Sequence, residues 1–453
     1  MTIHHPGGER KGGERLLDLF IADLNGNLRG KCLAHDGLEK AMKEGLKLPR
    51  SVLGFDFWGA DVLDNGLVFE TGDSDGICRP VAASPMPVPW SSTPRDQMLA
   101  MMFNPDGSPF GADPRQVLSQ VVGRFDALGL TPVVATELEF YLMDAEAETR
   151  QRPLPPALRD GDGRRLANTE GYNMEEMDGF EAFFADVRNA CRVQGIGIDT
   201  LIAEMGPGQF EANFHHVADP LNAADQAILF KRLARGVARR HGYAATFMAK
   251  PYAHESGNGF HAHFSLLDRQ GRNVFDDGTA RGSRLLGHAI AGMVATMPEA
   301  MLMLAPHQNS WRRFMPGSHA PTCANWGYEN RTVALRVPDS PGAARRIEHR
   351  VAGADANPYL VLAAVLAGAL YGIEQALAPP PPLAGDAYAE GQPSASLPCE
   401  WGQAIELLAR SEVLKHYLGG EFVRVYLAVK RQERRLLGER IPDVEYDAYL
   451  GLL

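Results

Sequence analysis

The sequence is poor in cysteine, and its few cysteines follow no metal-binding pattern. Five residues are scattered along 453 positions and never stand in C-x-x-C spacing: Cys32, Cys78, Cys191, Cys323 and Cys399. An odd number of irregularly spaced cysteines argues against a disulfide framework and against a structural zinc site. Such a chain suits a reducing compartment, and we expect a cytoplasmic protein.

An excess of positive charge and long hydrophobic runs are also missing. The formal net charge is −11, which disfavours nucleic acid as a partner. The longest apolar run, residues 359–373, is short and rich in Ala and Gly, so it predicts a buried helix rather than a membrane span. Residues 1–15 lack the apolar core of a signal peptide. We therefore expect neither a nucleic acid nor a membrane as a partner.

The length and the turn signals predict a small domain followed by a large one. Residues 14–34 alternate around a turn at Asn25–Gly26, which predicts a β-hairpin. A helix-like stretch at 36–46 and a strand-like stretch at 50–63 follow it. Residues 104–113 are rich in Pro, Gly and Asp and mark a boundary. We expect domains at 1–109 and 110–453, the second opening with a helix capped by Asp113.

Two glutamates stand in an otherwise apolar strand at residues 133–142. Glu137 and Glu139 are two positions apart, so on a strand they share one face. Buried carboxylates on one face repel each other, and removing each from water costs several kcal/mol. A metal ion would offset that cost, and the rest of the chain should then supply further ligands.

Four further polar clusters are candidates for such ligands. They comprise Glu204 and Glu211 around a Gly/Pro turn; His261, His263 and Ser265 on one strand face; Arg331 with Arg336; and Arg346, Glu348 and Arg350 on one face. Alone, each is more typical of core ion pairs, satisfied histidines or surface arginines. Together, five Glu and two His in strand-like contexts exceed what structural ion pairs need. Arg331 and Arg336 are five apart, so at least one must lie off a regular strand.

These residue types favour a phosphoryl-transfer site. Carboxylate oxygens suit Mg²⁺ or Mn²⁺, and an imidazole leans toward Mn²⁺. Two such cations surrounded by arginines would shield phosphate charges and stabilise a transferring phosphoryl group. The sequence has no Walker A loop, no glycine-rich kinase loop and no Rossmann fingerprint. A nucleotide would therefore bind by another route.

The order of the motifs resembles the glutamine synthetase family over nearly the whole chain. The matching segments are Glu-x-Glu-Phe at 137–140, the glutamate pair around the Gly turn, "GFHAHFSL", "NRTVALRVP", "RRIEHR" and "ANPYL". The resemblance implies an α+β fold with a small β-grasp-like N-terminal domain and a large catalytic domain built on a curved antiparallel sheet with flanking helices. It also implies a homo-oligomer of two stacked hexameric rings, with active sites between neighbouring subunits.

The resemblance implies a role for each matched residue. Two metal sites would be held by Glu139, Glu204 and Glu211, and by Glu137, His261 and Glu348. ATP would contact His263, Ser265, Arg336 and Arg346. Glutamate would be bound by Gly257, Arg313, Arg331 and Arg350, of which Arg331 and Arg350 would also act in catalysis. The implied chemistry is phosphorylation of the glutamate γ-carboxylate by ATP, followed by attack of an amine that displaces phosphate.

Two departures from the family concern only the acceptor amine. Glutamine synthetases carry a glutamate six positions after the arginine matched by Arg313, and this chain has His319 there. The family's Asp-Gly-Ser-Ser loop is missing, and Asp56 is a candidate substitute beside Phe57 and Trp58. These aromatics would either form an apolar wall for an alkylamine or belong to the core of the small domain. The pattern resembles the γ-glutamylpolyamine (γ-glutamylputrescine) synthetase branch.

The prediction is therefore an ATP-dependent ligase that joins glutamate to an organic primary amine such as putrescine. One alternative is a glutamine synthetase that uses ammonia, and another is a catalytically silent relative with a structural role. A phosphotransferase with a guanidino acceptor is disfavoured by Arg313. The sequence leaves open the identity of the amine, the choice between Mg²⁺ and Mn²⁺, and whether the acid is glutamate or an analogue.

Overall fold

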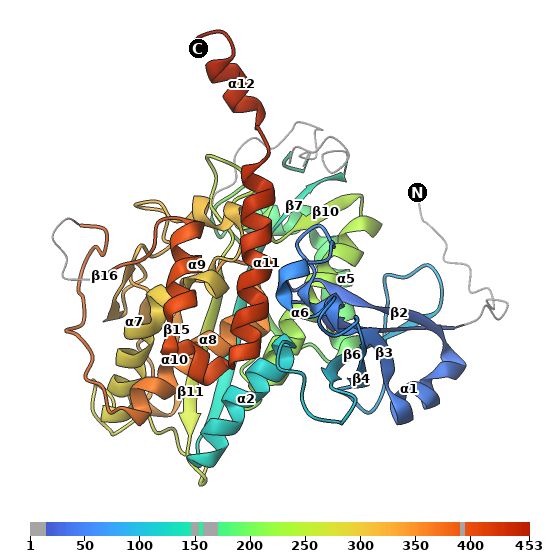
Figure 1. Cartoon of the computed structure of the whole chain (residues 1–453). Helices are drawn as coiled ribbons and strands as arrows, with labels where there is room; N and C mark the ends of the chain where they lie inside the picture. The colour runs from blue at the N-terminus through green and yellow to red at the C-terminus, as the bar shows by residue number, and fades with distance from the viewer. Residues whose placement is uncertain (1–14, 146–153, 157–170, 390–394) are drawn as a thin grey trace.

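The computed structural model describes residues 15–145, 154–156, 171–389 and 395–453. Its N-terminal part, blue in Figure 1, is a mixed sheet in the order β2-β1-β6-β4-β3, with β5 paired to β6. The strands and the helix of this part are β1 (Leu16–Ala22), β2 (Leu28–Ala34), α1 (Leu38–Glu44), β3 (Leu46–Pro49), β4 (Asp75–Pro80), β5 (Met86–Pro87) and β6 (Arg95–Phe103). The expected hairpin is confirmed, because β1 and β2 pair in antiparallel register.

The expectation of a strand over residues 50–63 is wrong. Residues Arg50–Gly54 form a 3₁₀ turn (η2), and an irregular loop leads to a second one at Leu63–Asn65 (η3). Within the loop, Asp56 Oδ1 accepts the backbone N–H groups of Trp58 and Ala60 at 2.9 Å each. A short carboxylate that binds nearby backbone groups in this way competes with strand pairing. The apolar run is therefore a folded loop.

The larger part is built on a sheet in the order β13-β14-β15-β11-β7-β9-β8, with β10 paired to the end of β7. These strands are β7 (Thr131–Asp144), β8 (Ile198–Ala203), β9 (Gln209–Phe214), β10 (Tyr243–Thr246), β11 (Phe260–Leu267), β13 (Trp326–Tyr328), β14 (Leu335–Val337) and β15 (Ile347–His349). Every pair is antiparallel except β13 with β14. A separate two-stranded ladder joins β12 (Cys323–Ala324) to β16 (Ala395–Ser396).

The long strand β7 shows how two glutamates can stand among apolar residues. Val134, Leu138 and Phe140 are fully buried on one face of this strand, where they join the hydrophobic core. Glu137 and Glu139 occupy alternate positions and are only partly buried. The period of two in a strand thus separates a core face from a polar face. The carboxylates lie on the polar face.

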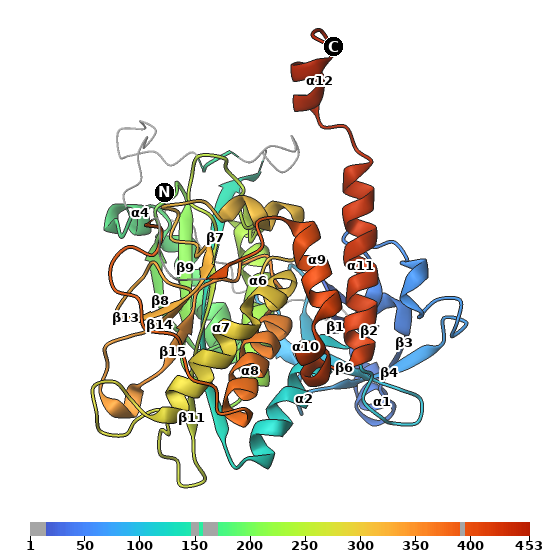
Figure 2. The same cartoon turned by 60° about the vertical axis from the view of Figure 1, so that its left-hand side comes forward.

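The helices of the larger part lie around its sheet, except α12, which projects from the body (Figures 1 and 2). They are α2 (Pro114–Ala127), α4 (Met174–Gly179), α5 (Glu181–Gln194), α6 (Pro220–Arg240), α7 (Arg284–Leu304), α8 (Pro358–Glu374), α9 (Trp401–Arg410), α10 (Glu412–Leu418), α11 (Gly420–Gly438) and α12 (Asp443–Tyr449). The expected cap of α2 is confirmed, since Asp113 accepts the N–H groups of Arg115 and Gln116. Short 3₁₀ turns are η1 (His35–Gly37), η4 (Gln308–Arg313) and η5 (Gly342–Ala344).

Helices α7 and α8 form the apolar centre of the larger part. They cross where Gly292 faces Gly368 and Gly372, and a Cβ on Gly292 would lie 2.2 Å from the Gly368 carbonyl oxygen. The expectation of a buried helix over residues 359–373 is confirmed by α8, most of whose residues are buried. Helix α7 has the length and composition of a membrane span, but 61% of that window is buried inside the protein.

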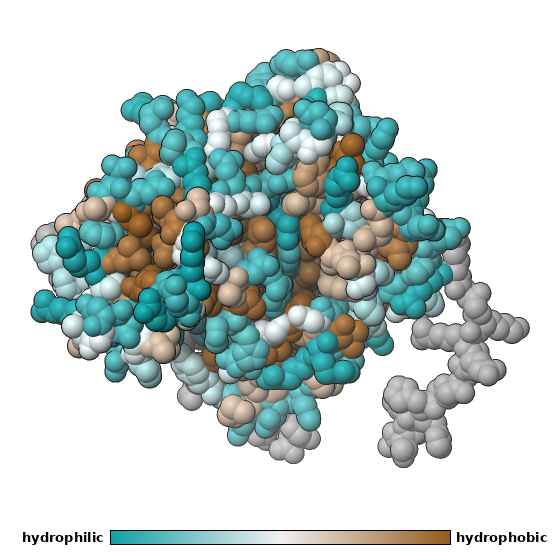
Figure 3. All heavy atoms as spheres, turned by 90° about the horizontal axis from the view of Figure 1, so that it is seen from below, coloured by the Kyte–Doolittle hydropathy of each residue, from teal (hydrophilic) through white to brown (hydrophobic). Residues whose placement is uncertain are grey.

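The chain ends in a projecting segment. Helix α11 runs along the body, and α12 then extends away from it in both views (Figures 1 and 2). No residue of α12 is buried, and Leu450 and Leu452 beyond it are 78% and 84% exposed. On the face seen from below, brown apolar patches interrupt a mostly hydrophilic surface (Figure 3).

Candidate active site

Strand pairing brings together acidic and imidazole side chains that are distant in the sequence. Glu137 on β7 lies opposite His261 on β11, and Glu139 lies opposite Glu211 on β9. On the other side of β11, His263 pairs with Glu348 on β15. Because these pairs lie across neighbouring strands, their side chains meet on one face of the sheet.

The β11–β15 side of this cluster is electrostatically compensated. His261 Nδ1 and His263 Nε2 each lie 2.9 Å from a carboxylate oxygen of Glu137. Glu348 accepts Arg336 Nη1 at 2.9 Å and is also bonded by Arg350. Burial raises the pKa of Glu348, but the charges of Arg350 and the histidines outweigh it and bring the pKa to about 2. The Glu348 carboxylate is therefore ionised.

Glu137 follows the same balance. Burial raises the pKa of Glu137, but the hydrogen bond from His261 and the close approach of His263 outweigh that effect, so the pKa lies well below its usual range.

The β8–β9 side lacks such compensation. Burial, followed by the charges of Glu137 and Glu139, raises the pKa of Glu211 to about 10. Burial and the charge of Glu139 raise the pKa of Glu204, which follows β8, to about 7. Both shifts record carboxylates that are forced close together away from water without a cation between them. This half of the cluster favours a bound cation most strongly.

The cluster fits divalent cations. Ligand atoms of Glu137, Glu211 and His261 lie within 4.8 Å of one another, and so do those of Glu137, His263 and Glu348. Carboxylate oxygens with one imidazole suit Mg²⁺ or Mn²⁺. The buried His263 Nε2 forms no hydrogen bond despite its nearness to Glu137. Glu137 belongs to both groups, and His261 Nδ1 also lies 3.9 Å from Glu348 Oε1, so the predicted division of the ligands between two sites stays a prediction.

A cavity of about 370 Å³ opens beside the cluster and gathers residues predicted to contact ATP. Glu137, His263, Ser265 and Arg346 line it. Arg336 does not line it, because its guanidinium is engaged with Glu348 and Glu329. Three of the four residues predicted to contact ATP thus line one cavity together with Glu137, a predicted metal ligand.

Sequence reasoning missed other residues that line this cavity. They are Thr136, Asp199, Asn213, His215 and His216, together with apolar neighbours. Asn213 is two positions after Glu211 on β9, so the strand period alone would have placed it on the polar face. Thr136 lies on β7 beside Glu137, Asp199 lies on β8, and His215 and His216 follow β9; none of them belongs to a recognised motif.

Arg313 and Gly257, both predicted to bind glutamate, are in contact. A Cβ on Gly257 would lie 2.8 Å from Arg313 Cγ, so the loop packs directly on the arginine side chain. Arg313 is buried and donates from Nη1 to the Val351 carbonyl at 2.8 Å. Its other guanidinium nitrogens remain free to hold a carboxylate of a ligand.

Gly259 was not predicted as a site residue, yet it lies where the two halves of the site meet. Its N–H donates to Glu139 Oε2 at 2.6 Å. A Cβ here would lie 2.8 Å from Arg313 Nη2, 3.0 Å from His261 Nε2 and 3.1 Å from Glu139 Oε1. Any side chain at Gly259 would therefore displace Arg313, which is predicted to bind glutamate, and the predicted metal ligands His261 and Glu139.

The remaining predicted residues lie in loops. Arg331 is exposed in the turn before β14, which confirms that one of the two spaced arginines lies off the strand. His319 is exposed and has a φ of 56°, in a loop tied to Arg313 by the Ser318 hydroxyl, which donates to the Arg313 carbonyl at 3.0 Å. This tie fixes the segment that precedes His319 relative to Arg313.

Asp56 and its aromatic neighbours lie in the folded loop of the N-terminal part. Among the described residues, the Asp56 carboxylate binds Trp58, Ala60 and Gln432 of α11, none of which belongs to the metal-ligand cluster. Phe57 and Trp58 are 54% and 42% exposed, so they are not core residues of the small domain. Gln432 of α11 thus fixes the Asp56 carboxylate within the chain.

The raised pKa values of Glu204 and Glu211 predict that a divalent cation stabilises the protein more as the pH rises. Unfolded carboxyls ionise above pH ~4.3, whereas the folded ones keep their protons to about 7 and about 10. Between these values the unfolded state binds fewer protons, so rising pH destabilises the metal-free fold. Ion binding requires the ionised form and offsets this loss. The shift of the melting temperature with Mn²⁺ should therefore grow from pH 5.5 to pH 8.5.

Glu211→Gln is the matched variant for this measurement, because it removes the most strongly raised carboxyl and keeps its shape. Its metal-free melting temperature should exceed that of the wild type at pH 8.5, and its shift with Mn²⁺ should be smaller. An Mn²⁺ shift that is equal at the two pH values would contradict the prediction.

Comparison with known proteins agrees with this geometry. The glutamine synthetase catalytic domain family matches residues 111–449. The chain is 39% identical over 441 residues to the γ-glutamylputrescine synthetase PuuA of Escherichia coli (strain K12), covering 97% of this chain and 92% of that protein. It is 34% identical over 446 residues to the glutamate–isopropylamine ligase of a Pseudomonas species, covering 96% and 95%.

A solved structure is similar over the whole chain. The ADP complex of GmaS superposes with a TM-score of 0.81 at 27% identity and covers 97% of each chain. Sequence and fold agree. The chain therefore belongs to the glutamine synthetase family of ligases.

Proposed function

We propose that this ligase joins the γ-carboxylate of glutamate to an organic primary amine at the expense of ATP. A γ-carboxylate oxygen attacks the terminal phosphorus of ATP, and the bond to ADP breaks. The amine nitrogen then attacks the acyl carbon, loses a proton, and expels phosphate as the new C–N bond forms. Relatives that act on putrescine and isopropylamine support this reaction class.

The sheet residues supply the first half of the reaction. Mg²⁺ or Mn²⁺, when bound at the carboxylate cluster, would shield the phosphate oxygens and align them with the attacking carboxylate. Arg346 and His263 line the cavity where the nucleotide would lie. Arg313 would hold the α-carboxylate of glutamate, and Arg350 and the exposed Arg331 would neutralise charge on the transferring phosphoryl group.

The presence of His319 where glutamine synthetases carry a glutamate favours an organic amine as the acceptor. A carboxylate at this position would attract ammonium and take its proton, whereas a neutral imidazole attracts it far less. The exposed position of His319 leaves space for a substituent on the acceptor nitrogen. A glutamine synthetase that uses ammonia is the second candidate, since all the other predicted residues suit it equally. A silent structural role is disfavoured, because the cluster would then hold buried carboxylates without a counter-ion.

We also propose that the protein is cytoplasmic and assembles as two stacked hexameric rings. All five cysteines are free, which suits a reducing compartment. The projecting C-terminal segment supports assembly, because a monomer would leave its apolar residues in water.

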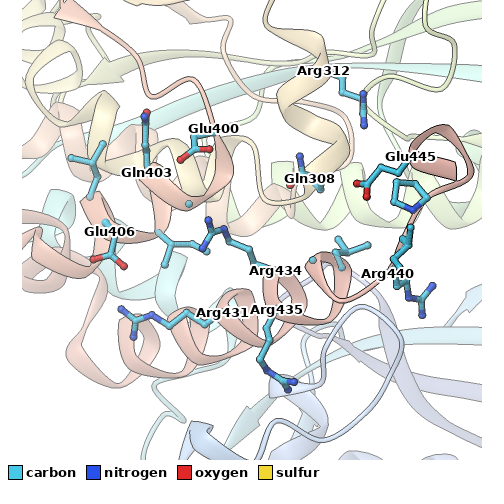
Figure 4. A pocket seen from close by; sticks show the side chains of 17 residues that line it. Gln308, Arg312, Glu400, Gln403, Glu406, Arg431, Arg434, Arg435, Arg440 and Glu445 are labelled. Carbon is cyan, nitrogen blue, oxygen red and sulfur yellow. The ribbon is translucent and has the colours of Figure 1, made fainter. Parts of the chain in front are cut away.

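The basic groove at the base of α12 is a fitting receptor for that segment from a second copy. The groove has a volume of about 1530 Å³ and lies between α9, α11 and η4 (Figure 4). Five arginines line it, including Arg431, Arg434 and Arg435 of α11, together with Glu400, Glu406 and the chain's own Glu445; α12 also carries Asp443 and Asp447. Opposite charges and exposed apolar residues on the two sides suit an exchange of C-terminal segments between copies.

The decisive test of the proposed reaction is phosphate release from ATP with glutamate, Mg²⁺ or Mn²⁺ and a panel of acceptors. The panel contains ammonium, methylamine, ethanolamine, putrescine, spermidine and an aromatic amine. Release should be at least tenfold faster with one organic amine than with ammonium, a difference of about 1.4 kcal/mol in transition-state stabilisation. Release with ammonium alone would make the protein a glutamine synthetase.

Substitution at His319 tests the selecting residue itself. His319→Glu should shift the preference toward ammonium, because it restores a carboxylate that attracts the cation. His319→Gln is the matched control, since it removes the imidazole without adding charge and should not favour ammonium. If His319→Glu has the same acceptor preference as the wild type, His319 does not determine the acceptor.

Removal of residues 441–453 should lower the mass of the assembly in analytical ultracentrifugation, because the apolar C-terminal segment is lost. Leu450→Asp should act in the same direction through the cost of placing a charge in an apolar contact. Glu412→Gln on α10, outside the groove and the C-terminal segment, is the control and should keep the assembly. A full-length chain that is monomeric at micromolar concentration would refute the proposed assembly.

A further inference from the structure

A cationic cavity lies between the two parts of the chain and is not lined by the catalytic cluster. It has a volume of about 640 Å³ and lies between the β1–β2 turn, the Phe57–Trp58 loop and helix α6. A second hollow of about 290 Å³ opens on the other side of the turn. Lys231 and Arg235 line both, so the same two cations face both hollows. A volume of this size suits a small organic ligand.

Both cations lack a carboxylate partner among the described residues. Lys231 is only 6% exposed, and its one hydrogen bond goes to the Ala356 carbonyl at 2.8 Å. Arg235 forms neither a hydrogen bond nor an ion pair, and its guanidinium lies 5.2 Å from the centre of the Phe247 ring. One residue after Lys231, Arg232 is by contrast paired with Asp18 at 2.5 Å. Arg232 is thus neutralised, whereas Lys231 and Arg235 line the cavity without an ion pair among the described residues; Arg239 of the same helix lines only the second hollow.

The cavity wall holds a further unsatisfied donor. Trp401 is 2% exposed and lines the larger hollow, and its indole Nε1 has no hydrogen-bond partner. A buried N–H group without an acceptor is rare and favours a bound acceptor. It is independent of the two cations, because it comes from α9 rather than from α6.

The acidic groups in the wall do not neutralise these donors. Glu433 accepts Asn25 Nδ2 at 2.7 Å and Lys430 Nζ at 2.9 Å, so it is already engaged. Asp355 accepts the Ser310 hydroxyl at 2.5 Å and forms no ion pair with Lys231. Burial and the charge of Arg235 lower the pKa of Lys231 to about 7, and the charge of Asp355 opposes this shift only in part.

We propose that this cavity is a second ligand site, which binds a small organic anion through Lys231, Arg235 and the Trp401 indole N–H. A carboxylate or a phosphate group supplies the acceptor oxygens that these donors lack. Phe57, Trp58 and Phe247 give the rest of the wall an aromatic surface, which suits a flat apolar body on the ligand. Since residues of both parts line the site, its occupant would stabilise their relative position.

Titration calorimetry on the full chain, with ADP and Mg²⁺ at saturation, tests the site. The probes are AMP for an organic phosphate, benzoate for an organic carboxylate, and inorganic phosphate as the bare anion. We expect AMP or benzoate to bind more tightly than inorganic phosphate, and the better of the two identifies the anionic group. Absence of binding by both, or equal binding by inorganic phosphate, would overturn the proposal.

Three variants localise the binding. Arg235→Gln should weaken it at least tenfold, equivalent to the loss of one charge-assisted hydrogen bond. The variant should fold, because this side chain is exposed and unpaired. Trp401→Phe keeps an aromatic ring, removes the N–H, and should also weaken binding. Arg240→Gln removes a charge from the same helix outside both hollows and should bind like the wild type. Unchanged affinity in Arg235→Gln would place the ligand elsewhere.

Discussion

Repulsion between buried carboxylates is the constraint on which the catalytic part depends. Glu137 and Glu139 share one face of β7, and β9 places Glu211 directly opposite Glu139. Like charges this close, away from water, destabilise the fold unless something neutralises them. The chain neutralises only one side, through two histidines at Glu137 and two arginines at Glu348. The other side is left for a cation, which makes metal affinity a direct consequence of incomplete compensation.

The fold must hold these carboxylates together against their repulsion. The backbone ladder of β7 with β9 and β11 fixes their spacing, and apolar side chains behind the strand anchor it in the core. The paired glycines between α7 and α8 allow tight packing in that core. Burial of this size stabilises by about 25 cal/mol for each Å² of apolar surface. The charged face is therefore supported by a large apolar one.

Local patterns predicted those features that depend on local sequence. The hairpin at Asn25–Gly26, the Asp113 cap and the buried helix α8 follow from turn, cap and composition rules. The motif order gave the family as well. The same rules failed for residues 50–63, because one carboxylate, that of Asp56, turned an apolar run into a loop. A single side-chain contact of this kind leaves no periodic signal.

Other parts of the site depend on contacts that only the folded chain creates. Gly259 matters because Arg313, His261 and Glu139 approach it from three segments, and a glycine in a strand motif does not reveal such neighbours. The sharing of Glu137 between two ligand groups follows from strand register rather than from spacing. The interdomain cavity likewise arises where α6, α9 and the β1–β2 turn meet, and none of them carries a ligand motif.

The division between sheet and loop separates the residues predicted to bind ATP and metal from the residue predicted to select the acceptor. The predicted residues for ATP and metal lie on strands or at their ends, where a change disturbs several neighbours at once. His319 lies in an exposed loop, and its φ of 56° is a conformation that any non-glycine residue adopts at some cost. Histidine is among the residues enriched at positive φ and glutamate is not, so histidine bears this cost more easily. A substitution at the exposed His319 therefore disturbs fewer neighbours than a substitution on the strands.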